Sequence, residues 1–343
     1  MRAAVYYGAR DIRSETVPVP ARAANEILIR VLRSGLCGTD VTEWLSGPHM
    51  IPLHHEHPHS HHEGPMIPGH EIVGEVVAAP TDSELAPGTL VASGAQVWCG
   101  TCARCLEGRV NICESLYTLG LNAPGGHAEY LVGPASTFVR VPEGLELDAA
   151  GLAQPLAVGL HAARRSGARP GDSVLISGAG AIGSFVIAGL RHLIPDLRIT
   201  VTDVDESALE RARRIGATDA MPVGGASETR ADFDVVIEAS GAPGTIATCL
   251  ARVRTGGRAL IVGMPAKPVE LDAYRLVLQE VTIETTVALI TADDLGEALQ
   301  ILASTDLARE LLDSVRPLEQ IGTVLEAMAA GRIAGKVLLD PTR

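Results

Sequence analysis

The sequence has little positive charge, and no long run of lysine and arginine concentrates it. Its 28 lysines and arginines stand against 41 aspartates and glutamates, which leaves a formal charge of −13. Proteins that bind nucleic acids neutralise phosphates with a basic patch or stripe. This composition supplies no such patch, so we expect neither DNA nor RNA as a partner.

The sequence also lacks the apolar segments that direct a chain to a membrane. Its first residues, MRAAVYYGARDIRSE, contain no apolar stretch of the length found in signal peptides. The most apolar stretch, residues 174–190, contains four glycines and is followed by Arg191. A membrane span needs roughly 20 apolar residues, so this stretch is too short. We predict a cytoplasmic protein with no membrane partner.

Cysteines are few, but four of the six lie within fifteen residues. Cys99, Cys102, Cys105 and Cys113 form the pattern C-x2-C-x2-C-x7-C. Four thiolates around one Zn²⁺ are typical of a structural zinc site, and the segment between them is too polar to form a core of its own. Two disulfides or four unrelated thiols are the alternative, although disulfide frameworks are typical of small secreted chains. The pattern favours structural zinc.

The arrangement of apolar residues changes twice along the chain. Residues 1–148 contain short alternating runs separated by proline and glycine, which indicate a β-rich, barrel-like unit. Residues 149–287 alternate strand, glycine turn and amphipathic helix, which predicts an α/β unit with a doubly wound parallel sheet. Residues 288–343 show helical spacing and a final strand, and we expect them to return to the first unit.

A dinucleotide-binding motif lies in the second unit. Gly178, Gly180 and Gly183 form G-x-G-x-x-G, with Ile182 before the last glycine, between a predicted strand and a predicted helix. The first glycine allows a tight turn, the second allows the backbone to approach a pyrophosphate, and the third allows the helix to pack on the strand. Asp203 ends the next predicted strand, where a carboxylate accepts the ribose hydroxyls of adenosine. We predict a bound dinucleotide.

The residues around Asp203 favour NAD over NADP. A carboxylate at this position repels the 2'-phosphate of NADP. The following residues, Val204, Asp205 and Glu206, provide no arginine to bind that phosphate.

Three further residues of the first unit are candidate metal ligands. Cys37 lies in SGLCGTD, and His70 and Glu71 lie in PGHE. Each alone is more often a packed or hydrogen-bonded residue of the protein interior. Together they supply a thiolate, an imidazole and a carboxylate, and three protein ligands with one open position are the composition of a catalytic zinc site.

These motifs give the chain its resemblance to a known family. GLCGTD, PGHE, the four-cysteine segment, AQPLAVGLHA and GAGAIG followed by Asp203 occur in this order. With these motifs in this order, the chain resembles the zinc-dependent medium-chain alcohol and polyol dehydrogenases over essentially its whole length. Within that family it most resembles the sorbitol and (R,R)-2,3-butanediol dehydrogenases. The resemblance implies a GroES-like catalytic domain formed by 1–148 and 288–343, and a Rossmann NAD-binding domain formed by 149–287.

The resemblance also implies an activity and the residues that carry it out. It implies an NAD-dependent oxidation of a secondary alcohol, such as a vicinal diol, hydroxyketone or polyol, with two zinc ions per chain. Cys37, His70 and Glu71 match the ligands of the catalytic zinc, and Asp40 matches a carboxylate behind those ligands. Thr39 matches the hydroxyl that passes the substrate proton toward the nicotinamide ribose.

Two positions differ from the pattern of this family. Gln154 stands where polyol dehydrogenases usually have glutamate. Because Cys37 and Glu71 already neutralise Zn²⁺, a neutral Gln154 keeps the ion a better Lewis acid than a second glutamate would. Thr42 stands where many relatives have the histidine that ends the proton relay, so the proton would reach solvent through water or the ribose.

Other functions remain open at this point. A dehydrogenase of an amino alcohol or cyclitol would use the same chemistry and differ in its pocket. A metal-handling protein would use the histidine-rich segment, although three prolines break any regular array there and favour a solvated loop. That segment contains His54, His55, His57, His59, His61 and His62.

The resemblance also implies a homodimer or homotetramer. Two predicted strands, residues 258–263 and 281–288, are apolar enough to pair edge to edge between subunits. His127, His161 and Cys249 are interpreted as structural, the histidines as hydrogen-bonding residues and the cysteine as a core thiol.

Overall fold

The computed structural model describes residues 1–224, 233–265 and 267–343, and it divides into two compact units. Unit 1 consists of Met1–Gln154 and Leu289–Arg343, and unit 2 of Pro155–Ala288. The first boundary therefore falls inside helix α4 (Ala153–Arg165), a few residues beyond the predicted position.

Unit 1 is built around a seven-stranded sheet whose centre is strand β3 (Glu26–Gly35). Every second residue from Ile27 to Val31 is fully buried, as expected where one face of a sheet covers a core. The sheet follows the order β16-β17-β3-β4-β5-β9, with β8 also paired to β3. The remaining strands of this sheet are β4 (Glu71–Ala78), β5 (Leu90–Ser93), β8 (Tyr130–Pro134), β9 (Phe138–Arg140), β16 (Leu312–Pro317) and β17 (Lys336–Asp340).

Smaller elements surround this sheet. Two strand pairs lie outside it, β1 (Arg2–Gly8) with β2 (Asp11–Thr16) and β6 (Gln96–Val97) with β7 (Tyr117–Thr118). The helices of the first segment are α1 (Gly38–Ser46), α2 (Ala103–Leu106), α3 (Leu147–Ala150) and two 3-10 turns, η1 (Val110–Ile112) and η2 (Ala135–Thr137). Those of the second are η4 (Thr291–Leu295, a π-helix), α9 (Gly296–Ser304), α10 (Leu307–Leu311), η5 (Leu318–Gln320) and α11 (Ile321–Ala329).

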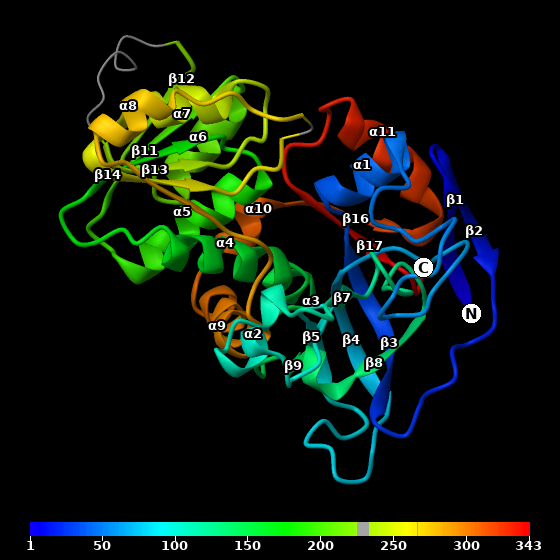
Figure 1. Ribbon diagram of the computed structural model, residues 1–343. Helices are drawn as coiled ribbons and strands as arrows, with labels where there is room; N and C mark the ends of the chain where they lie inside the picture. Colours follow the sequence, from blue (N-terminus) through cyan, green and yellow to red (C-terminus); the bar gives the residue numbers. More distant parts are fainter. Residues whose placement is uncertain (225–232, 266) are drawn as a thin grey trace. The chain divides into compact units, whose positions relative to one another are not determined.

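The last strand ties the second segment of unit 1 to the first. β17 pairs with β16 in parallel and with β3 antiparallel, with Leu339 opposite Ser34 (Figure 1). All five of its residues are buried. Arg33 of β3 holds this junction, because its guanidinium lies 3.1 Å from the Asp340 carboxylate and 2.6 Å from that of Asp148.

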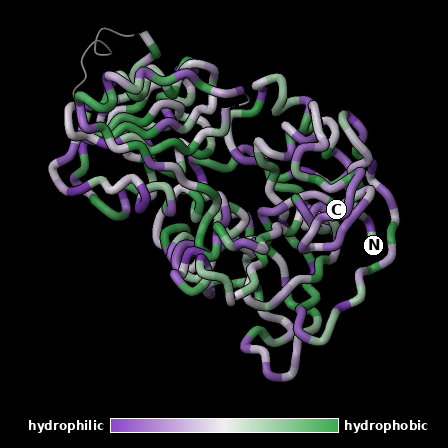
Figure 2. Tube along the Cα trace, in the orientation of Figure 1, coloured by the Kyte–Doolittle hydropathy of each residue, from purple (hydrophilic) through white to green (hydrophobic). Residues whose placement is uncertain are grey.

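Unit 2 contains the predicted doubly wound parallel sheet. Its six strands follow the order β12-β11-β10-β13-β14-β15, and every adjacent pair is parallel. The central strands are nearly continuous apolar runs, which Figure 2 shows mostly in green, as expected for strands buried on both faces. The strands are β10 (Ser173–Ser177), β11 (Arg198–Asp203), β12 (Asp219–Pro222), β13 (Phe233–Glu238), β14 (Val253–Ile261) and β15 (Thr282–Thr285). The remaining helices are α5 (Ala181–Leu193), α6 (Glu206–Arg214), α7 (Thr245–Arg252) and α8 (Ala273–Leu278).

One expectation about the sheet edges is wrong. The sequence suggested that both 258–263 and 281–288 could pair with another subunit, but β14 lies between β13 and β15. The backbone groups of β14 are hydrogen-bonded on both sides, and of these two strands only β15 lies at an edge of the sheet that the structure describes. Within the described residues, no helix combines the length and the apolar character that a membrane crossing requires.

We expect the Arg33–Asp340 pair to stabilise unit 1. Asp340→Ala leaves a guanidinium that is only 11% exposed without one of its two partners, so the free energy of unfolding should fall by about 3 kcal/mol. Asp11→Ala removes a pair whose side chains are 55% and 41% exposed, and should cost less than about 1 kcal/mol. Urea unfolding followed by tryptophan fluorescence measures both, since both tryptophans, Trp44 and Trp98, belong to unit 1. Equal effects would contradict the expectation.

Candidate metal and dinucleotide sites

The pairing of β3 with β4 brings three predicted metal ligands together. Cys37 lies two residues beyond the end of β3, and Glu71 is the first residue of β4, opposite Gly35. Antiparallel strands place the end of one beside the start of the next, so the loops that carry Cys37 and His70 meet. One donor atom from each of Cys37, His70 and Glu71 lies within 4.8 Å of the others.

Two of these three residues carry a buried polar atom that has no hydrogen-bond partner among the residues that the structure describes. His70 is 7% exposed and Glu71 is 2% exposed, and the atoms are His70 Nδ1 and Glu71 Oε2. A buried polar atom without a partner costs roughly 1–3 kcal/mol, so such atoms indicate a missing ligand. Gly35 leaves the space, because a Cβ there would collide with Glu71 Oε2. A thiol, an imidazole and a carboxylate arranged in this way fit Zn²⁺.

A buried lysine fixes the orientation of Glu71. Lys336 Nζ donates to Glu71 Oε1 at 2.5 Å and to the Leu36 carbonyl at 2.7 Å, and it makes no bond to Glu71 Oε2. Burial alone would lower the pKa of Lys336, but the negative charges of Glu71 and Cys37 raise it above its usual value. Burial raises the pKa of the Cys37 thiol, and the Lys336 ammonium opposes that rise.

The sequence reasoning missed Lys336. It is one of only two lysines in the chain, and it is the first residue of a final strand, KVLLD, that is buried along its whole length. A charged residue inside such a strand needs a buried partner, and this was the available signal.

Helix α1 positions the other polar residues near the cluster. Asp40 Oδ2 accepts the Cys37 N–H at 2.8 Å at the first turn of the helix. Burial raises the Asp40 pKa to about 7, although the nearby His70 lowers it. Thr39 Oγ1 lies 3.8 Å from Cys37 Sγ, whereas Thr42 is exposed and its hydroxyl donates to the Gly38 carbonyl.

Gln154 is buried at the second position of α4, where unit 1 ends. Its side chain is 9% exposed.

The four-cysteine segment forms a second cluster. The Sγ atoms of Cys99, Cys102, Cys105 and Cys113 lie within 4.8 Å of one another, with separations of 3.5–4.0 Å for three pairs. A tetrahedron of thiolates about 2.3 Å from one ion has edges of about 3.8 Å, whereas a disulfide requires about 2.05 Å. None of the six cysteines, all of which lie in the described part of the chain, forms a disulfide. This geometry fits a Zn²⁺ ion and excludes the disulfide alternative.

Hydrogen bonds from backbone amides favour the ionised form of one cysteine in this second cluster. The N–H groups of Thr101 and Cys102 both donate to Cys99 Sγ, and these bonds lower the pKa of that thiol to about 6. In Cys105 burial raises the pKa to about 12. A thiol that ionises easily binds a metal more readily, because the thiolate is the ligand.

The glycine motif lies between β10 and α5 of unit 2. Gly178 has a φ of +103°, which favours glycine, and a Cβ on Gly183 would collide with the Gly178 carbonyl. Gly180 is exposed at the start of α5, where the amides of a helix N-terminus point outward, and Ile182 is half-buried. Asp203 ends β11, and its carboxylate accepts the N–H of Ala179 at 2.6 Å.

Arg211 binds the backbone of this glycine loop, and the sequence analysis did not identify it. It lies on α6 and is 7% exposed, and its Nη2 donates to the Ala179 carbonyl at 3.0 Å. The sequence of α6, ESALERARR, gave no reason to choose Arg211 over the four other arginines and glutamates of the helix as the buried one.

The remaining histidines and cysteine that the sequence analysis considered belong to neither ligand cluster. Among the residues that the structure describes, no group of three possible metal ligands includes a histidine of the 54–62 segment, and most of those histidines are exposed. Cys249 is 3% exposed in the apolar core of unit 2, and His161 is 7% exposed. His127 is fully buried and contacts Ser34.

Comparison with known proteins shows the same two parts. Residues 23–143 match the alcohol dehydrogenase GroES-like domain family, and residues 181–304 match the zinc-binding dehydrogenase family. The chain is 35% identical to the L-threonine 3-dehydrogenase of Pectobacterium carotovorum over 271 residues, which cover 74% of each protein. It is 34% identical to the L-threonine 3-dehydrogenase of Escherichia coli over 78% of each.

Solved structures resemble the whole chain. The 2R,3R-butanediol dehydrogenase of Bacillus subtilis has a TM-score of 0.90 at 25% identity and covers 99% of both chains. The L-idonate 5-dehydrogenase of Escherichia coli has a TM-score of 0.87 at 26% identity, with 99% of this chain and 97% of the other covered. With the matched domains and the ligand clusters, these similarities show that the chain is an oxidoreductase and belongs to the zinc-dependent medium-chain alcohol dehydrogenase family.

Proposed function

We propose that the protein transfers a hydride between a secondary alcohol of a small polar molecule and NAD, using a catalytic zinc ion held by Cys37, His70 and Glu71. The observation that carries this proposal is the convergence of three residues of different chemistry, two of which carry a buried polar atom without a partner among the described residues. A second zinc, held by the four cysteines, would have a structural role. A reducing compartment such as the cytoplasm would keep these thiols available as ligands.

The residues around the cluster have distinct tasks in this reaction. A zinc ion at this site would act as a Lewis acid that lowers the pKa of a substrate hydroxyl. Thr39 would take the hydroxyl proton at Oγ1, close to Cys37. Thr42 does not continue this relay, because its hydroxyl donates to the Gly38 carbonyl and its side chain faces solvent. The proton would leave from Thr39 through water or the ribose, and the neutral Gln154 would leave the charge of the ion less compensated than a glutamate would.

The negative charge of Asp203, at the end of β11, favours NAD over NADP. The Asp203 carboxylate is held by the N–H groups of Ala179 and Asp205, so it cannot turn away from a phosphate. Val204 beside it is 88% exposed and offers no positive charge. Solved structures of this fold contain NADH in one case and NADP in another, so residues of this kind decide the cofactor rather than the fold.

Two substrate classes follow from different observations. Vicinal diols, hydroxyketones and polyols are supported by the motifs of the sequence and by the similarity to a butanediol dehydrogenase. An amino alcohol with a secondary hydroxyl is supported by the L-threonine 3-dehydrogenases, which are 34–35% identical. Both classes present a hydroxyl next to a second polar group.

An assembly of two or four copies fits the exposed surface of unit 2. β15 has an unpaired edge, and Ile283 on it is 40% exposed. Helix α8 adds Tyr274, Val277 and Leu278, which are 65–78% exposed. An apolar surface next to a free strand edge favours pairing with a second copy.

The two zinc sites should respond differently to the loss of a cysteine. The parent protein should contain about two zinc ions per chain by metal analysis. Cys37→Ala should lose one ion and turnover while keeping its melting temperature, because that ligand set holds no loop together. Cys102→Ala should lose the other ion and melt at a lower temperature, since the segment depends on the metal. Turnover by Cys37→Ala, with one zinc ion lost, would contradict the assignment of the catalytic site.

The cofactor preference should depend on Asp203. We expect kcat/KM for NAD to exceed that for NADP by at least about tenfold, which corresponds to about 1.4 kcal/mol. Asp203→Ser combined with Val204→Arg should reverse the direction of this preference. The control is Asp205→Ser, which changes a neighbouring carboxylate at the start of α6. A lower KM for NADP in the parent protein would overturn the assignment of NAD.

A screen of NAD reduction separates the substrate classes. The panel contains L-threonine, other amino alcohols, stereodefined 2,3-butanediols, hydroxyketones, polyols including L-idonate, and cyclitols, with Cys37→Ala as the inactive control. We expect one class to exceed the rest in kcat/KM, because a pocket that hydrogen-bonds a second polar group rejects analogues without it. If no compound is oxidised and mixing with NADH causes no fluorescence enhancement, the protein is a metal-handling protein instead.

A further inference from the structure

The segment that contains His127 lies directly against the loop that carries His70. The N–H groups of Gly125, Gly126 and His127 donate to the carbonyls of Ile67, Gly69 and Pro68, at 2.7–2.9 Å. These three bonds hold the residues immediately before His70 as part of a backbone ladder. The position of His70 therefore depends on residues 125–127.

The imidazole of His127 packs against the same loop. Gly69 has a φ of +99°, and a Cβ there would lie 2.5 Å from His127 Nδ1. Only glycine allows the ring to approach the backbone this closely. His127 thus contacts the residue before His70 with its side chain as well as its backbone.

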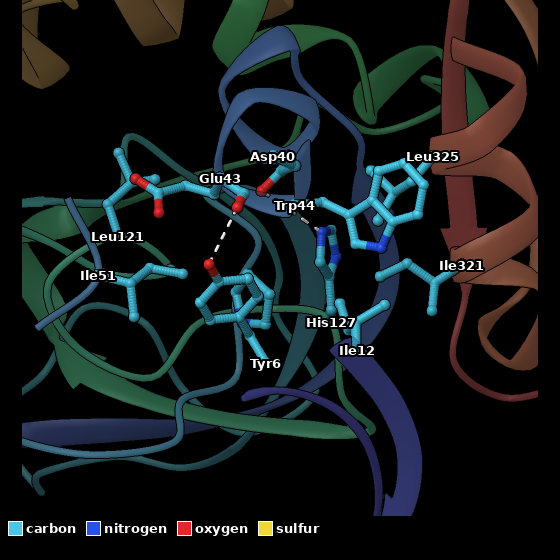
Figure 3. Close-up of a pocket in the computed structure, with 12 residues that line it drawn as sticks. Tyr6, Ile12, Asp40, Glu43, Trp44, Ile51, Leu121, His127, Ile321 and Leu325 are labelled. Carbon is cyan, nitrogen blue, oxygen red and sulfur yellow. Dashed lines mark hydrogen bonds and ion pairs between the residues drawn. The ribbon is translucent and has the colours of Figure 1, made fainter. Parts of the chain in front are cut away.

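The polar atoms of this imidazole point in two directions. Nδ1 lies 2.8 Å from Ser34 Oγ. Nε2 is fully buried, has no hydrogen-bond partner and lies 3.9 Å from Asp40 Oδ1, which also lacks one. Figure 3 shows the ring and the carboxylate facing each other beside Trp44. The cavity they line has a volume of only about 10 Å³, so it holds at most one water molecule and no substrate.

The protonation state of His127 follows from its surroundings. Burial, with smaller effects from His70 and Lys336, lowers the His127 pKa to about 3, so the ring is neutral and carries one N–H. Asp40 offers an acceptor, and Ser34 can donate its hydroxyl hydrogen to Nδ1. Nδ1 therefore faces the Ser34 hydroxyl, and Nε2 faces the Asp40 carboxyl group 3.9 Å away.

Asp40 connects this ring to the second metal-binding loop. Its other oxygen, Oδ2, accepts the N–H of Cys37 at 2.8 Å. His127 therefore contacts the loop of His70 directly and the loop of Cys37 through one carboxylate. We propose that His127 is a positioning residue of the catalytic metal site, which holds Cys37 and His70 in place for zinc through Asp40 and Gly69. This inference rests on the proposed catalytic zinc.

Three variants distinguish the effect of the polar atoms of the His127 side chain from the effect of its size. His127→Phe keeps a ring against Gly69 and removes the two ring nitrogens that face Ser34 and Asp40. His127→Gln provides an amide donor at nearly the same distance from the backbone. Thr137→Val is the control, because it removes a buried hydroxyl of unit 1 that donates to the Pro134 carbonyl, outside the metal cluster.

The measurement is the dissociation constant of the zinc ion at Cys37, His70 and Glu71, obtained by competition with a chelator without substrate or cofactor. Cys37→Ala identifies which of the two ions belongs to this site. Loss of a group behind a metal ligand typically weakens binding 10- to 100-fold. We expect a loss of that size in His127→Phe, recovery of most of it in His127→Gln, and a change below about twofold in Thr137→Val.

The melting temperature of the zinc-free proteins tests the alternative that His127 only supports the fold. For a positioning residue, zinc-free His127→Phe melts close to the zinc-free parent protein. Zinc affinity equal to that of the parent overturns the inference, as does equal loss in His127→Phe and His127→Gln. If the parent protein itself binds no zinc at Cys37, the proposed function fails instead.

Discussion

The antiparallel pairing of β3 with β4 is the interaction on which the metal site depends. It places Gly35 opposite Glu71, so that the loop after one strand and the loop before the other present their side chains to the same space. Cys37 and His70 are 33 residues apart in the sequence, and nothing local could bring them together. A shift of this register by one residue would turn Glu71 to the other face of the sheet and disperse the ligands.

The same sheet also places a positive charge beside the negatively charged ligands of this site. A buried thiol and a buried carboxylate side by side repel each other when both are ionised, and burial raises the pKa of the Cys37 thiol. β17, on the other side of β3, delivers Lys336 to the Leu36 carbonyl and to Glu71. A cation in direct contact with one of two anionic ligands favours the charged forms that bind a metal. The ligand set and its counter-charge are thus held by neighbouring strands.

Local patterns in the sequence predicted much of this protein. The glycine motif, the four-cysteine segment and the change from short strands to alternating strands and helices are all readable within short windows, and they predicted the parallel sheet and the family. The roles of Lys336, Arg211 and His127 could not be predicted in this way. Lys336 and Arg211 lie in a strand and a helix whose patterns fit their secondary structure, His127 lies in a loop, and the partners of all three are distant in the sequence. Their importance comes from which strands are neighbours, which also decided that β14 is internal and β15 is not.

The contribution of β17 to unit 1 has a consequence for synthesis of the protein. Lys336 is made 265 residues after Glu71, and the whole of unit 2 is made in between. A complete dinucleotide-binding unit therefore leaves the ribosome while the metal-binding unit still lacks strands β16 and β17 and the cation for its buried glutamate. Both groups of metal ligands are made early, within the first 154 residues, but the carboxylate of Glu71 gains the partner that fixes its orientation only when β17 pairs with β3.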